Sequence, residues 1–115
     1  MKKIIFSALL ILSSAAIAGY EDADRDSLEK AVAVFEKQSV YFAAQYPAAT
    51  SNQRKCVLLI NYLGVASTAH GEAMYFGMYY PDLFTSSGMK AAAEAMNEVA
   101  DKTLMEIRAV GCALD

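Results

Sequence analysis

The residue types that most often carry chemistry are scarce in this chain, which holds two cysteines and one histidine among 115 residues. The histidine, His70, stands two positions before Glu72. On a helix that spacing points the two side chains to different faces, so the pair makes neither a catalytic dyad nor a zinc site. Patterns of the GxSxG, HExxH, phosphate-loop and dinucleotide-binding kinds are absent from the sequence. We therefore predict a protein that is not an enzyme and that uses no metal or cofactor.

His70 allows two interpretations. An imidazole changes charge at about pH 6, so His70 could act as a sensor of external acidity. The structural alternative, which we favour, is a hydrogen-bonded histidine near a helix end.

The two cysteines, Cys56 and Cys112, are placed to pair with each other. Their midpoint falls inside a turn expected from Pro81 to Ser87, so an antiparallel helical hairpin folded there brings the two thiols together. Two lone cysteines in an oxidising compartment most often form a disulfide. We predict the Cys56–Cys112 disulfide, with two free buried thiols as the alternative. The disulfide would leave neither cysteine available as a nucleophile or metal ligand.

The first eighteen residues indicate export. Lys2 and Lys3 precede an apolar stretch, and small residues lead up to Ala18. This order is typical of a secretory signal peptide, and the apolar stretch falls short of the roughly 20 residues that cross a bilayer. We predict a signal peptide over 1–18 and a single domain over 19–115 that is periplasmic or secreted. Cleavage removes two lysines and takes the net charge from −3 to −5, which does not suit a nucleic-acid binder.

Apolar residues at spacings of three and four predict the first and third of three helical segments. The first begins with a capping pair, Asp26 and Glu29, and ends before Pro47. The third is capped by Ser86 or Ser87 and ends at Gly111. The predicted stripe of the first is Leu28, Ala31, Val32, Phe35, Ser39, Phe42 and Tyr46. That of the third is Met89, Ala92, Ala93, Met96, Val99, Ala100, Thr103, Leu104 and Ile107.

The second segment, from about Gln53 to Tyr80 with Thr50 as its cap, is almost free of charge. Between Cys56 and Met89 only Glu72 and Asp82 are charged, which predicts a central helix buried on most sides. Gly71 leaves open whether residues 53–80 form one helix or two. Its predicted buried stripe is Cys56, Leu59, Ile60, Leu63, Ser67, His70, Met74 and Gly77. The expected fold is all-α: a small antiparallel bundle of three to four helices, with a helical hairpin closed by one disulfide.

The end of the second segment concentrates tyrosine, methionine and phenylalanine. Two pairs spaced four apart, Tyr75 with Tyr79 and Phe76 with Tyr80, lie on faces rotated by about 100 degrees, so they cannot all enter one core. Large amphipathic side chains and adaptable methionines are typical of protein interfaces. An ordinary core with a few exposed tyrosines, and a homodimer seam, are the alternatives. The partner-binding candidates are Met74, Tyr75, Met78, Tyr79, Tyr80 and Phe84.

The run Cys56-Val-Leu-Leu-Ile-Asn-Tyr-Leu-Gly-Val65, with a second cysteine at Cys112 in an acidic exported chain, resembles the small periplasmic immunity proteins that neutralise cell-wall amidase toxins of type VI secretion. The resemblance covers roughly Lys55 to Cys112 and departs from that family in having no further cysteine between the two. Periplasmic acid-stress chaperones share the size and the two-cysteine arrangement, but they are richer in lysine.

These observations favour a non-catalytic exported domain that binds a protein partner. The sharper expectation is an immunity or inhibitor protein that occludes a cell-wall-targeting toxin. The alternatives are a periplasmic acid or envelope stress chaperone, and a helical bundle that binds a small ligand in a cavity bounded by Tyr62, Met74 and Met96. No nucleic-acid partner and no stable membrane insertion after signal cleavage are expected.

Overall fold

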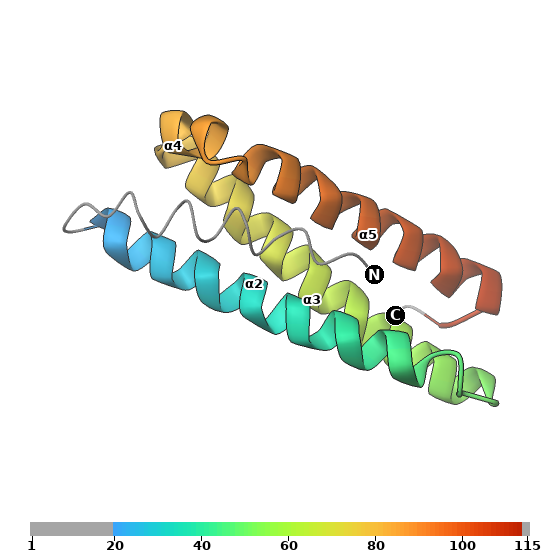
Figure 1. The fold of residues 1–115 in the computed structure, drawn as a ribbon. Helices are drawn as coiled ribbons and strands as arrows, with labels where there is room; N and C mark the ends of the chain where they lie inside the picture. Colours follow the sequence, from blue (N-terminus) through green and yellow to red (C-terminus); the bar gives the residue numbers. More distant parts are fainter. Residues whose placement is uncertain (1–19, 114–115) are drawn as a thin grey trace.

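The computed structural model describes residues 20–113 and contains four helices within them (Figure 1). They are α2 (Tyr20–Gln45), α3 (Asn52–Tyr79), α4 (Pro81–Ser86) and α5 (Met89–Val110). The prediction of an all-α fold is confirmed. The predicted signal peptide lies outside the described residues. No helix within residues 20–113 is long and apolar enough to cross a membrane.

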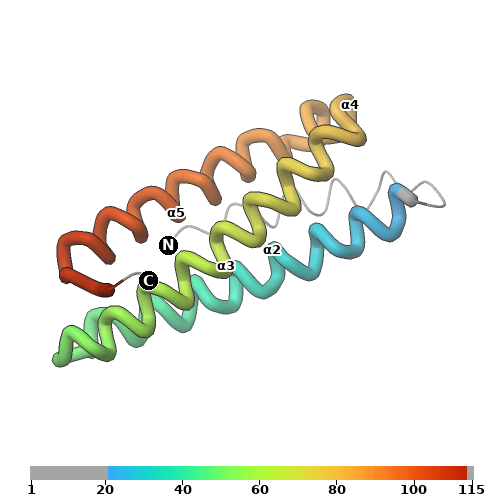
Figure 2. The backbone as a smooth tube through the Cα atoms, turned by 180° about the vertical axis from the view of Figure 1, so that it is seen from behind, coloured from blue at the N-terminus to red at the C-terminus, as the bar shows by residue number. Residues whose placement is uncertain are grey.

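Helix α3 lies at the centre of the bundle. It runs antiparallel to both α2 and α5 and packs along each of them, while the short α4 turns the chain from α3 back into α5 (Figure 2). The chain stays helical through Gly71, so residues 52–79 form one helix rather than two. The predicted central position of this segment is confirmed.

The predicted buried side of α3 is wrong. That stripe ran through Ile60, Ser67 and Met74, which are all exposed. The buried positions are instead Leu58, Leu59, Tyr62, Ala66, Ala69, Ala73 and Phe76. Ala66, Ala69 and Ala73, on successive turns of α3, are small enough to let neighbouring helices approach closely. A pattern search that weighs only large apolar residues does not detect such a contact. The prediction that α3 is buried on most sides is also wrong, because one face is exposed from Val57 to Tyr79.

Stacked aromatic rings hold α2 against α3. The ring of Tyr62 stacks on both Phe35 and Phe42, at centroid distances of 5.9 and 4.5 Å. Its hydroxyl lies 2.8 Å from Ser39 Oγ, which donates its only hydrogen to the carbonyl oxygen of Phe35. Tyr62 must therefore be the donor to Ser39.

The predicted stripes of α2 and α5 are confirmed, since every member is buried or half-buried.

Two predicted helix starts are wrong. Helix α2 already includes Tyr20, so Asp26 is not a cap but an interior residue that pairs with Lys30 at 2.9 Å. At α3 the N-cap is Ser51, whose hydroxyl accepts a hydrogen bond from the backbone N–H of Arg54. Thr50, the predicted cap, lies one residue too early.

The turn predicted from Pro81 to Ser87 is mostly a short helix, α4. The N-cap of α5 is Gly88, in the left-handed region with φ of 80°, and not Ser86 or Ser87 as predicted. Ser87 Oγ nevertheless accepts a hydrogen bond from the N–H of Met89. Gly111 ends α5 as predicted, also with a positive φ of 87°.

The predicted disulfide joins Cys56 to Cys112, with their Cα atoms 5.6 Å apart, and no free cysteine remains. It links the first turns of α3 to the residues just after α5, at the end of the hairpin opposite α4. Disulfides persist in oxidising compartments outside the cytoplasm. The covalent link therefore indicates an extracytoplasmic protein.

Reducing the disulfide should lower the free energy of unfolding by up to about 4 kcal/mol, because the link closes a long loop in the unfolded chain. Urea unfolding with and without a reducing agent measures the change, and the Cys56→Ala, Cys112→Ala double variant should match the reduced protein. Equal stability of the oxidised and reduced proteins would show that the link contributes nothing.

Tyr62→Phe should cost about 1 kcal/mol of unfolding free energy, because it removes a buried hydrogen bond but keeps the stacked ring. Tyr41→Phe is the matched control: Tyr41 accepts a hydrogen bond from Arg54 at the surface, so its loss should change stability by less than about 0.5 kcal/mol. Chemical unfolding of both variants measures the difference. Equal costs would contradict the role given to the Ser39 contact.

Candidate functional site

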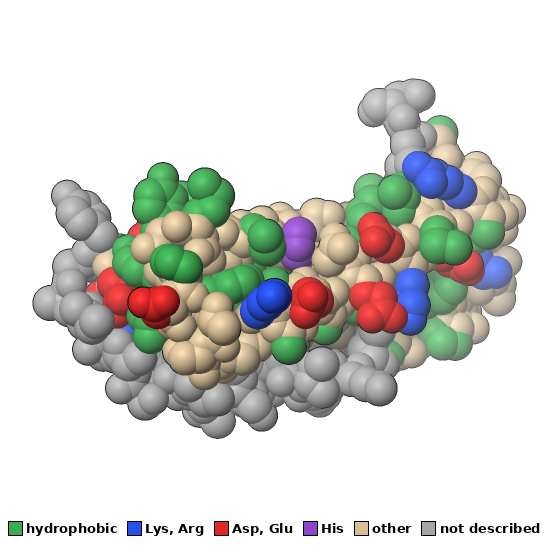
Figure 3. All heavy atoms as spheres, turned by 90° about the horizontal axis from the view of Figure 1, so that it is seen from above, with side chains coloured by type: hydrophobic (Ala, Val, Ile, Leu, Met, Phe, Trp, Pro, Cys, Tyr) green, Lys and Arg blue, Asp and Glu red, His purple; other side chains and the backbone are tan. Residues whose placement is uncertain are grey.

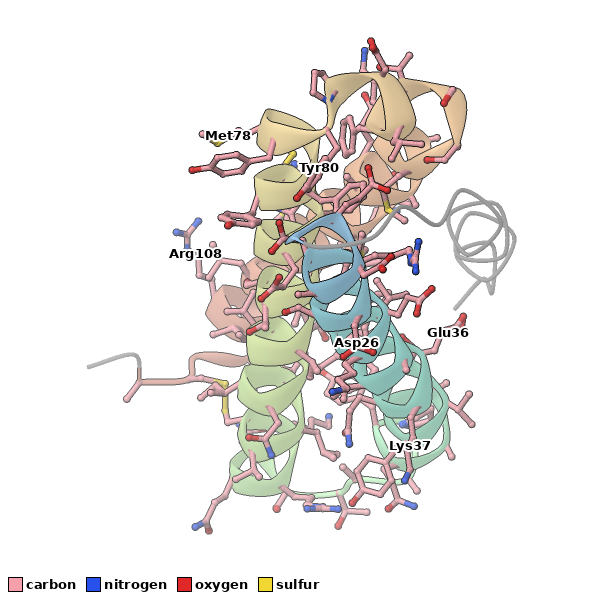
Figure 4. The ribbon with its side chains drawn as sticks, turned by 90° about the vertical axis from the view of Figure 1, so that its left-hand side faces the viewer. Asp26, Glu36, Lys37, Met78, Tyr80 and Arg108 are labelled. Carbon is pink, nitrogen blue, oxygen red and sulfur yellow. A yellow bond between two sulfur atoms is a disulfide. The ribbon has the colours of Figure 1, made fainter. Side chains whose placement is uncertain are left out.

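Four large side chains lie in solvent on the last two turns of α3. Their exposed fractions are 46% for Met74, 46% for Tyr75, 76% for Met78 and 61% for Tyr79. We call these four residues the Met–Tyr face. Figure 4 shows Met78 pointing away from the bundle. Tyr75 and Tyr79 contact each other as predicted, with ring centroids 4.8 Å apart.

The other two predicted partner-binding residues, Tyr80 and Phe84, belong to the packing beneath this face. Both are half-buried against the core, as is Leu83. The Tyr80 ring packs on Phe76, and its hydroxyl donates a 2.7 Å hydrogen bond to Asp24 of α2. In Figure 4 the side chain of Tyr80 accordingly turns toward the first turns of α2.

Gly77 lets α4 close against α3. A Cβ atom built on Gly77 would lie only 3.0 Å from the ring of Phe84, so a larger residue would push that ring away. The absence of a side chain at this turn therefore allows Phe84 to pack on α3. This contact holds α4 beside the Met–Tyr face.

An open cleft of about 480 Å³ adjoins the Met–Tyr face, between the first half of α2 and the second half of α3. Tyr75 belongs to both features. The cleft is lined by Asp24, Ser27, Thr68, Gly71, Glu72 and Tyr75. We call these six residues the acidic cleft. Seen from above, the α4 end of the molecule also carries hydrophobic side chains at its surface (Figure 3).

The two carboxylates of the cleft are held in place by neighbouring hydroxyls. Glu72 accepts a 3.2 Å hydrogen bond from Ser27, and Asp24 accepts the bond from Tyr80. The pKa of Tyr75 is raised, chiefly by the negative charge of Asp24 and further by burial, Tyr79 and Glu72. The phenol of Tyr75 therefore lies in a negative electrostatic field.

The two cysteines and His70 do not form a common site. Both cysteines are in the disulfide. His70 is half-buried on α3, and no hydrogen bond or ion pair joins it to another residue of the described chain. Among residues 20–113 no three His, Cys, Asp or Glu side chains are grouped to hold a metal ion. The favoured interpretation, a hydrogen-bonded histidine near a helix end, is therefore wrong, because His70 lies inside α3 and has no such partner among the described residues. Its role as a sensor of acidity stays a prediction.

The suggested ligand cavity is not formed by its three predicted residues. Tyr62 and Met96 are buried in the core, whereas Met74 faces solvent. Met74 therefore does not line a cavity with the two core residues.

Sequence reasoning missed the acidic cleft because its residues come from two helices. On α3 the spacing of Thr68, Glu72 and Tyr75 does mark one face. On α2, Asp24 precedes Asp26, the predicted start of the first helix, whereas the helix in fact already includes Tyr20. Only the register of α2 on α3 brings the two sets together.

The raised pKa values of two tyrosines predict that the free energy of unfolding falls at alkaline pH. The pKa of Tyr80 is raised from 10 to about 12, mainly by its hydrogen bond to Asp24. The pKa of Tyr46 is also raised to about 12, by burial and then by its hydrogen bond to Glu106. Because both folded-state values exceed the unfolded value, the stabilisation is complete below pH 10 and is lost as pH rises toward about 12.

Thermal unfolding followed by circular dichroism from pH 9 to about pH 12 checks this expectation. The Tyr46→Phe, Tyr80→Phe double variant should show a smaller fall in melting temperature over that interval than the native sequence. Parallel falls in both proteins would assign the alkaline loss to other groups.

Comparisons with known protein families, with curated proteins and with solved structures find no match to this chain.

Proposed function

We propose that this protein is an exported, non-catalytic domain that binds another protein through the Met–Tyr face. The observation that carries the proposal is the exposure of four large side chains on two successive turns of one rigid helix. Most isolated apolar side chains on a surface need no explanation, but a contiguous group is typical of a binding site.

The chemistry of the face suits a protein partner. Tyrosine offers a large contact area with few rotatable bonds and a polar tip, and methionine adapts its shape to an opposing surface. The Tyr75 and Tyr79 rings already contact each other, so binding has less side-chain freedom to remove.

The rigidity of the support also favours binding. Helix α3 is held by α2 and α5 along its length, by the disulfide near its start and by Phe84 near its end. A surface fixed before binding loses little conformational entropy on association, which increases affinity. A domain with this property fits the role of an immunity or inhibitor protein that occludes a toxin, the sharper form of the proposal.

A photo-crosslinking side chain placed at position 78 tests the proposal. In an envelope extract of the source cell it should form a covalent adduct with one protein, which mass spectrometry then identifies. Position 105 is the matched control, because Met105 is also a strongly exposed methionine, at 66%, but lies on α5. Equal labelling from both positions, or labelling from neither, would contradict the proposal.

The Met78→Ser, Tyr79→Ser double variant should weaken binding of the identified partner by about thirtyfold or more, since truncating one of the few residues that dominate an interface costs about 2 kcal/mol or more. Met105→Ser should bind as the native protein does. Both proteins should keep their stability to within about 0.5 kcal/mol per exposed site. Calorimetric titration measures the affinities, and unchanged binding by the double variant would place the interface elsewhere.

A further inference from the structure

The acidic cleft and the Met–Tyr face form one continuous surface, because Tyr75 belongs to both. On one side of Tyr75 lie exposed methionine and tyrosine. On the other side lie two carboxylates and two hydroxyls around a glycine. A partner that covers the face also reaches the cleft, so the charge of the cleft bears on what that partner must carry.

The carboxylates of the cleft can accept more hydrogen bonds than they receive, and the lining residues include no lysine, arginine or histidine. Each carboxylate receives one hydrogen bond from a hydroxyl, whereas two carboxylate oxygens can accept about four. The two bases in the first half of α2 are already paired within that helix, Arg25 with Asp22 at 3.0 Å and Lys30 with Asp26 at 2.9 Å. Asp24 and Glu72 therefore face the cleft without a counter-charge among its lining residues.

The lining also gives a long cationic side chain room to enter. Gly71 is exposed, and a Cβ atom built on it meets nothing within 4 Å. The ring of Tyr75 stands at the edge of the same space. An aromatic ring beside carboxylates attracts an ammonium or guanidinium group both through its face and through the neighbouring charges.

We propose that the Met–Tyr face and the acidic cleft together dock a basic segment of a protein partner, whose Lys or Arg side chain enters the cleft between Asp24 and Glu72. The apolar residues of the segment pack on Met78 and Tyr79. This inference rests on the proposed function and extends it by naming the chemistry of the partner. Complementarity of charge selects the partner, and the apolar face supplies contact area.

A second copy of this chain is the wrong occupant. The full chain already has a net charge of −3. From Cys56 to the end of α4, the only charged residues are Glu72 and Asp82. A two-fold dimer through the face would set like charges opposite each other, which opposes association.

Titration of the isotope-labelled, disulfide-bonded protein with two peptides tests the proposal. The peptides share length and leucine positions, and lysine in one is replaced by glutamate in the other. The lysine peptide should shift the backbone amide signals of Ser27, Thr68 and Gly71 and bind about tenfold or more tightly than the glutamate peptide. Equal affinities, shifts confined to other regions, or no binding of the lysine peptide at millimolar concentration would overturn it.

Substitutions at Gly71 and Gly64 separate blocked binding from damaged folding. Both glycines are exposed on α3 with open space around them, and only Gly71 lines the cleft. Gly71→Gln should fill the cleft and weaken binding of the lysine peptide about tenfold, whereas Gly64→Gln should leave it unchanged. Replacing glycine within a helix removes a conformational cost, so neither variant should unfold. Equal affinities for both variants would contradict the proposed position of the cation.

The charge itself is tested by Glu72→Gln, which keeps an acceptor for Ser27 but removes the negative charge. It should weaken the lysine peptide several-fold and reduce the dependence of its affinity on salt, while Glu94→Gln on the exposed side of α5 should do neither. If Met78→Ser and Tyr79→Ser impair partner binding while the cleft variants do not, the proposed function stands and the cationic partner is wrong. If neither set has an effect, both proposals are wrong.

Discussion

The position of α2 on α3 depends on one buried ring. Tyr62 is stacked on Phe35 and Phe42, two turns apart on α2, and its hydroxyl is bonded to Ser39 between them. A slip of α2 by one turn would break the stacking and leave buried hydroxyls without partners, so this register is strongly preferred. The same register brings Asp24 to Tyr80 and Ser27 to Glu72, farther along the helix pair.

The two ends of the α3–α5 hairpin are held by different means. At one end the Cys56–Cys112 link restrains the chain covalently. At the other end, Phe84 packs against the backbone of Gly77. Gly77 lies about 32 Å along α3 from Cys56, at roughly 1.5 Å of rise per helical residue. The Met–Tyr face lies at this second end, where the support comes from close packing rather than from a covalent bond.

The core that provides this support is built with small residues. Ala66, Ala69 and Ala73 are fully buried in the middle of α3, with larger rings toward both ends. Because alanine loses no side-chain entropy and allows close helix approach, it can form a tight central contact without much volume. The central contact of α3 therefore does not use its large side chains. The tyrosines and methionines of the Met–Tyr face lie at the surface, where a partner can contact them.

The sequence alone determined the helical class, the order of the helices, the buried stripes of α2 and α5, and the pairing of the cysteines. Each follows from local spacing or from chain symmetry about the turn near Pro81, and these signals survive in any arrangement of the helices. It failed on the orientation of α3, because a helix almost without charge has no polar face to mark its solvent side. Alanines at three buried turns made the true core face look weaker than the exposed one.

The tertiary structure decided which aromatic residues face solvent and which carboxylates face one another. Tyr79 and Tyr80 are adjacent in the chain, yet one is exposed and the other is bonded to Asp24, because a step of one residue rotates a helix by about 100 degrees. The acidic cleft joins residues more than forty positions apart, as the Ser27–Glu72 hydrogen bond shows. Such a site exists only once the register between two helices is set, and that register is a property of packed side chains rather than of local sequence.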